Sequence, residues 1–215
     1  MILPHTSFLR FVVLFIAVFL LCYFGALMIT GLAVPGDHYS EFIEKYFNIA
    51  AWIRSALISC SKSLLSVFGV ATYRADEYIL REVNGRGIRL VYSCLGFGVM
   101  SFWTAYIMAS ADTVKHKLLW LPAGLILIFI INVTRISLVL KTANSGRHFP
   151  FGWDHHTWFN IIAYIFMLGL IFLHERIASK ANRQKAKGKE PPTTDDRPPK
   201  RIDGDYDPLL FKNEE

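Results

Sequence analysis

Three side-chain types that could together carry out acyl transfer occur at separate points of the chain: Cys94, Arg135 and the neighbours His155 and His156. A cysteine attacks a carbonyl carbon as its thiolate, which needs a nearby cation or base because the unperturbed thiol pKa is about 8.5. A histidine can take the thiol proton and return it to a leaving amine. The rigid N–H donors of an arginine suit an oxyanion or a substrate carbonyl. These residues could therefore form a cysteine-dependent acyl-transfer site.

Each of these residues also has a purely structural interpretation. Cys94 could be a packing residue at the start of a helix, and Arg135 could extend to the lipid headgroups or pair with Asp154. Asp154 in turn could orient a histidine or cap a helix. The adjacent histidines could bind a metal, but neighbours on one helical turn point apart and the sequence offers no obvious third ligand. We therefore expect no metal and no cofactor.

The elements that must position these residues are apolar segments. Hydrophobic residues make up 53% of the 215 residues, and no charged residue interrupts four long stretches, which lie between Arg10 and Asp37, Arg89 and Asp112, Lys117 and Arg135, and Asp154 and Glu175. Each stretch approaches the ~20 residues that span hydrocarbon. The sequence predicts an all-α integral membrane protein with about four transmembrane helices, at residues 11–34, 95–111, 118–140 and 156–173.

The segment between the first two spans has a different character. Apolar residues recur at helical spacing over residues 39–69, but Arg54 and Lys62 argue against a span, so we expect an amphipathic helix at the outer interface. Residues 73–93 have strand character on either side of Asn84-Gly85, which is a strong hairpin signal. The predicted β-hairpin leads directly into Cys94.

The positive charge is concentrated after the last apolar segment. The net charge is +6, and six lysines and arginines lie between positions 176 and 189, a pattern typical of a cytoplasmic anchor beside a membrane helix. We therefore do not expect a nucleic-acid partner. The composition then turns to Lys, Asp, Pro and Thr, so the sequence predicts a membrane-embedded domain over residues 1–176 and a disordered cytoplasmic tail over residues 177–215.

Helix parity predicts where the reactive residues lie. If both termini are cytoplasmic and residues 39–69 do not cross the membrane, then Cys94, Arg135 and the histidines share the outer face. Because a charge inside hydrocarbon costs several kcal/mol by most estimates, an intramembrane arginine such as Arg135 is a functional candidate in its own right. We expect a multi-pass protein of the plasma (inner) membrane whose site faces the outside or periplasm.

The order of three motifs resembles the exosortase/archaeosortase family of membrane-embedded cysteine transpeptidases. These motifs are YSCLGFG around Cys94, NVTR from Asn132 to Arg135, and HHTWFN at the start of the last span. The resemblance implies Cys94 as nucleophile, Arg135 as essential arginine and His156 as catalytic histidine, with His155 as the alternate. Asn132 and Asp154 would support them. Leu95 stands where the family usually has serine in Cys-Ser-Gly.

The resemblance also implies a substrate class. A compact member of this family would recognise substrate proteins by a C-terminal sorting signal, made of a short motif, a transmembrane helix and a basic cluster. It would cleave near the motif at the outer face and pass the acyl group to an acceptor. Two other functions are compatible with the same residues: a different integral membrane cysteine acyltransferase or hydrolase, and a non-catalytic membrane scaffold.

Overall fold

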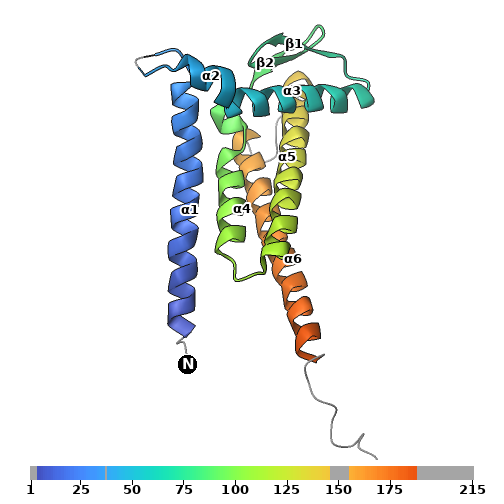
Figure 1. Ribbon diagram of the computed structural model, residues 1–215. Helices are drawn as coiled ribbons and strands as arrows, with labels where there is room; N and C mark the ends of the chain where they lie inside the picture. Colours follow the sequence, from blue (N-terminus) through green and yellow to red (C-terminus); the bar gives the residue numbers. More distant parts are fainter. Residues whose placement is uncertain (1–3, 37, 146–154, 188–215) are drawn as a thin grey trace, which may run out of the picture. The chain divides into compact units, whose positions relative to one another are not determined.

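A computed structural model describes residues 4–36, 38–145 and 155–187 of the chain (Figure 1). Side chains are described for residues 8–36, 38–145 and 161–180. The chain divides into two compact units, Met1–His174 and Glu175–Glu215. The first unit holds every element discussed below, except that the last helix continues into the second.

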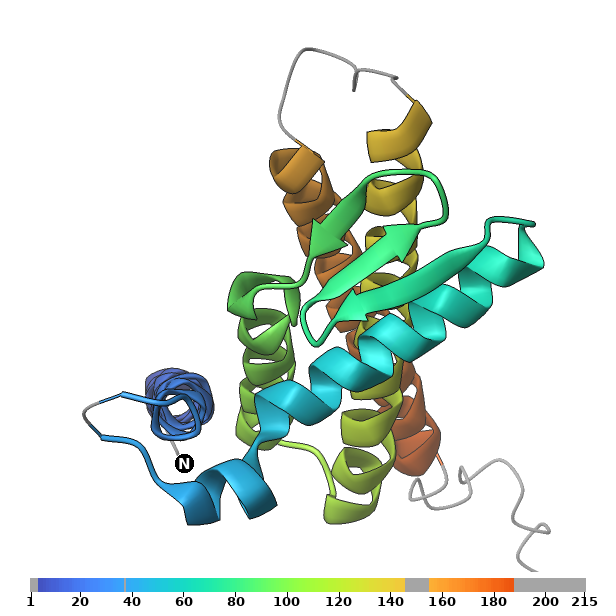
Figure 2. The same ribbon diagram turned by 90° about the horizontal axis from the view of Figure 1, so that it is seen from above.

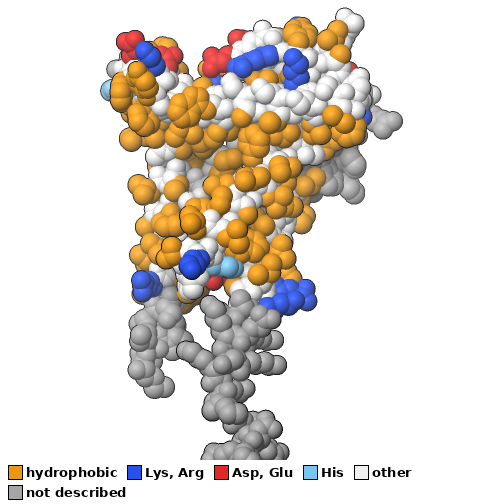
Figure 3. Space-filling view, turned by 45° about the vertical axis from the view of Figure 1, so that its right-hand side comes forward, with side chains coloured by type: hydrophobic (Ala, Val, Ile, Leu, Met, Phe, Trp, Pro, Cys, Tyr) orange, Lys and Arg blue, Asp and Glu red, His pale blue; other side chains and the backbone are white. Residues whose placement is uncertain are grey.

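Long apolar helices dominate the first unit. Helices α1 (Pro4–Leu32), α5 (Val114–Ser145) and α6 (His155–Lys187) each contain a segment long and apolar enough to cross a membrane. Helix α4 (Phe97–Ala109) packs between α1 and α5 and is equally apolar, but it has only 13 residues. Apolar side chains cover the helices on the face shown in Figure 3. The prediction of a mostly helical integral membrane protein is confirmed; among the described residues, three helices are long and apolar enough to span a membrane, and one further apolar helix is short.

The predicted amphipathic helix over residues 39–69 is two helices, α2 (Glu41–Phe47) and α3 (Ile49–Val67). Asn48 separates them because its side-chain oxygen accepts a hydrogen bond from the Ala51 N–H at 3.0 Å and so caps α3. Figures 1 and 2 show α3 lying crosswise to α4 and α5. Its buried residues Leu57 and Ile58 belong to one apolar core with residues of α5 such as Ile136.

The predicted hairpin is part of a three-stranded antiparallel sheet of β1 (Thr72–Asp76), β2 (Ile79–Glu82) and β3 (Gly87–Arg89). The β2–β3 turn contains Asn84, which adopts a left-handed φ of 63°. Strand β1 was not predicted separately because most of its residues are exposed and it lacks apolar alternation. The sheet contacts α3 and α5, and Leu80 and Leu90 are buried in the core beneath it.

The last helix extends further than the sequence predicts. Residues 177–187, assigned above to a disordered tail, continue α6 to Lys187. The reason lies in their composition, because Ala, Lys, Arg and Gln favour a helix and the first proline after it is Pro191. Residues 188–215 of the predicted tail lie outside the described part of the chain.

Candidate active site

Cys94 lies at a sharp junction between the sheet and the membrane helices. It ends a short 3-10 helix, η1 (Tyr92–Cys94), which follows the buried Leu90. The next residue, Leu95, is fully buried and anchors the junction in the core. The Cys94 thiol is free and half-buried. The fold therefore holds the backbone of this cysteine firmly while leaving its side chain partly accessible.

Asn132 ties this junction to α5. Its side-chain Nδ2 donates a hydrogen bond to the Cys94 carbonyl oxygen at 3.0 Å, and Asn132 itself is buried. Gly96 makes the approach possible, because it adopts a φ of +82° and a Cβ there would lie 3.3 Å from Asn132 Nδ2. The close approach of Asn132 and the left-handed backbone therefore both favour glycine at the position two residues after the cysteine.

Arg135 follows Asn132 by about one helical turn, so both residues belong to the same side of α5. Cys94 and Arg135 line one cavity of about 170 Å³, together with Arg89 and Leu90 at the end of the sheet. Two of the predicted site residues, far apart in the sequence, are therefore brought together. Arg89 was not predicted as a site residue. The sequence feature that could have indicated it is a basic side chain five positions before Cys94.

A second cavity adjoins the first through Arg135. It has a volume of about 270 Å³ and lies between α4, α5 and α6, where Gly96, Asn132 and Phe166 form part of its wall. The remaining lining is mostly aliphatic. Arg135 thus borders both a cavity at the sheet and an apolar cavity among the helices.

The predicted histidines lie only partly within the described residues. His155 and His156 form the first turn of α6, and the side chains of residues 155–160 and all of Asp154 lie outside the described part. Further along the same helix, Ile162 and Phe166 line the cavity that Arg135 borders. The roles of His155, His156 and Asp154 stay predictions.

Tyr92 is an aromatic, uncharged neighbour of Cys94 at the junction. Its ring stacks on Phe97 with centroids 5.0 Å apart. Burial, and to a smaller extent Tyr23, raises the pKa of the Tyr92 phenol above its ordinary value. A tyrosine phenol is neutral at physiological pH even at its ordinary pKa, so Tyr92 adds no negative charge near Cys94.

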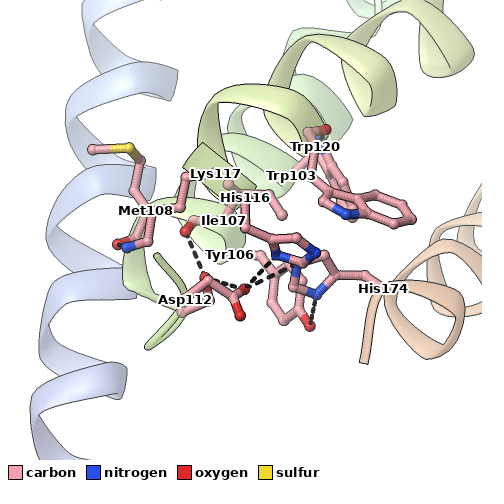
Figure 4. A network of polar contacts seen from close by, with 10 residues as sticks. Trp103, Tyr106, Ile107, Met108, Asp112, His116, Lys117, Trp120 and His174 are labelled. Atoms are coloured by element: carbon pink, nitrogen blue, oxygen red, sulfur yellow. Dashed lines mark hydrogen bonds and ion pairs between the residues drawn. The ribbon is translucent and has the colours of Figure 1, made fainter. Parts of the chain in front are cut away.

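A second polar cluster was missed by the sequence analysis. Asp112, His116 and His174 converge at the other end of α4, next to Tyr106 (Figure 4). Asp112 and His116 are spaced as i and i+4, but His174 comes from a distant segment, so the sequence alone gave no reason to group them.

Comparison with known proteins gives one family. The family model described as transmembrane exosortase (EpsH) matches residues 4–173 of this chain. That range begins with α1 and includes η1, α4, α5 and the first half of α6. No curated protein and no solved structure matches the chain.

Proposed function

Because the chain belongs to the transmembrane exosortase family, we propose that it is a membrane cysteine transpeptidase or protease in which Cys94 is the nucleophile. Membership of this family supports a membrane transpeptidase-type function in general terms. The observation that carries the assignment of residues is the cavity that Cys94 and Arg135 both line. A thiol and a guanidinium that border one cavity are suited to act as the nucleophile and the oxyanion partner of one reaction.

The proposed reaction has two steps. The Cys94 sulfur attacks the carbonyl carbon of the scissile peptide bond, and His156 accepts the thiol proton. The Arg135 N–H groups stabilise the oxyanion, the C–N bond breaks, and His156 returns the proton to the leaving amine. The resulting thioester is then attacked by an acceptor nucleophile, which releases the Cys94 thiol. Asn132 supports both steps by fixing the Cys94 carbonyl and hence the backbone of the nucleophile.

The proposed substrate is a protein with a C-terminal sorting signal, composed of a short motif, a transmembrane helix and a basic cluster. The apolar cavity among α4, α5 and α6 supports this class, because it adjoins Arg135 and offers aliphatic surface beside the reactive residues. An apolar segment next to the scissile bond would match that surface.

The proposed orientation places both termini in the cytoplasm and the site at the outer face of the plasma membrane. Lys115 and Lys117 lie in the first turn of α5, at the opposite end of α4 from Cys94, and further basic residues follow Arg176. By the positive-inside rule both basic regions favour the cytoplasm. Cleavage would then occur on the outer side.

Replacement of the cysteine tests the proposal. In the host organism, the Cys94→Ala variant should abolish processing and lead to accumulation of uncleaved substrate, measured by immunoblot. Cys60→Ala is the matched control, because Cys60 is exposed on α3 and is absent from the lining of both cavities. A Cys94→Ala variant that still cleaves, at unchanged abundance in the membrane, would contradict the proposed nucleophile.

A further inference from the structure

Three side chains with metal-ligating atoms meet where α4 turns into α5. Asp112 lies in the turn, His116 in the first turns of α5, and His174 on α6 (Figure 4). One ligand atom from each residue lies within 4.8 Å of the other two. His174 is only 1% exposed, while Asp112 and His116 are half-buried. The cluster is therefore sheltered without being closed.

The two distances from Asp112 to the histidines are close to those expected around a small divalent ion. Asp112 Oδ2 lies 3.1 Å from His174 Nε2 and 3.5 Å from His116 Nδ1. Tetrahedral zinc holds nitrogen and oxygen ligands at about 2.0–2.1 Å, which places neighbouring ligand atoms roughly 3.3–3.4 Å apart. We propose that Asp112, His116 and His174 bind a divalent transition-metal ion of the zinc class, with the fourth position taken by water or another exchangeable ligand.

The surroundings orient these ligands. His174 Nδ1 lies 3.1 Å from the Tyr106 hydroxyl, which leaves Nε2 directed at Asp112. The Trp120 ring meets the His174 ring edge-on, with centroids 5.1 Å apart. Metal-binding histidines usually have their second ring nitrogen held by such a partner, which fixes the tautomer and the ring. The His174 ring is thus already held in a ligating orientation.

An ion and the Ser110 hydroxyl could share the Asp112 carboxylate oxygen. Asp112 Oδ2 faces both imidazole nitrogens, and it lies 3.0 Å from Ser110 Oγ, whose single hydrogen it shares with the Ile107 carbonyl oxygen at 2.8 Å. One carboxylate oxygen has about two lone-pair sites. A single ion bound to both imidazoles and to this oxygen uses one of them, and Ser110 uses the other. The ion would tie α6 to the α4–α5 turn, and this inference is independent of the proposed peptidase activity.

Metal binding by the full-length protein tests the inference directly. The untagged chain is purified in detergent, treated with a chelator and then exposed to Zn²⁺ or Co²⁺. We expect one equivalent of Zn²⁺ per chain and the visible absorption bands of four-coordinate Co²⁺. A wild-type protein that binds well under one equivalent of Zn²⁺, or whose Co²⁺ spectrum is that of the hydrated ion, would overturn the proposal.

Variants assign the ion to this cluster. His116→Ala and Asp112→Asn should each lower the Zn²⁺ affinity at least 100-fold, and Tyr106→Phe, which removes only the orienting hydroxyl, should lower it roughly 10–100-fold. His38→Ala is the matched control, because His38 is exposed and lies in the α1–α2 connection. Affinity that is unchanged in both His116→Ala and Asp112→Asn would show that the ion binds elsewhere and would overturn the assignment.

Discussion

The two ends of α4 hold polar side chains in contrasting ways. At the Cys94 end, the reactive side chains border two cavities, and Cys94 and Arg135 are half-buried. At the Asp112 end, the side chains touch one another directly, and aromatic rings such as Trp120 close around the fully buried His174. A site that must admit a peptide needs space beside its reactive atoms, whereas a site for a single ion needs converging ligands.

After loss of Cys94, the largest loss of processing at the Cys94 end is expected from replacing His156, the proposed catalytic histidine. His156→Ala should slow substrate processing by about 10²–10⁴, because a positioned acid/base is lost. His155→Ala should have only a partial effect. Both are measured as the rate of precursor cleavage in a pulse-chase experiment. If His155→Ala were the more damaging variant, the assignment of the two neighbours would have to be reversed.

Replacement of the arginine by lysine distinguishes its two interpretations. Arg135→Lys keeps the charge but loses the planar fork of donors, so processing should slow by roughly 10²–10³ if Arg135 stabilises an oxyanion. If Arg135 only extends to the headgroups, lysine would substitute well. Arg86→Lys is the matched control, because Arg86 is an exposed residue of the β2–β3 turn. Cleavage rates are compared at equal protein abundance.

A smaller effect is expected at the tightly packed end. A Cβ at Gly124 would collide with Nε1 of the Trp103 ring, so Gly124→Ala should lower stability by about 1–3 kcal/mol through overpacking. Gly169→Ala is the control, because a Cβ there meets nothing within 4 Å. The readout is the midpoint of thermal unfolding in detergent. An unchanged midpoint for Gly124→Ala would mean that α4 and α5 pack less closely than described.

Much of the fold could be predicted because membrane helices are encoded by local composition. The four apolar stretches gave the helical architecture, but the break at Asn48 depends on a single capping hydrogen bond, and β1 lacks apolar alternation. The extension of α6 to Lys187 does not follow from charge content, which is shared by helices and disordered tails, but the residue types of this segment favour a helix.

The two polar sites differ in how far the sequence could reveal them. Cys94 and Arg135 could be grouped because each stands out against apolar neighbours and helix parity predicts a common face; the structure puts both on one cavity. Asp112, His116 and His174 could not be grouped, since their proximity depends on how α6 packs against the α4–α5 turn.

The shortness of α4 has a consequence for the surrounding lipids. Its 13 residues rise about 20 Å, roughly 10 Å less than the hydrocarbon thickness of a typical bilayer. Such a mismatch is accommodated by thinning the bilayer locally or by gathering shorter acyl chains, at a cost of fractions of a kcal/mol per Å. We therefore expect the protein to function best in membranes of short acyl-chain length.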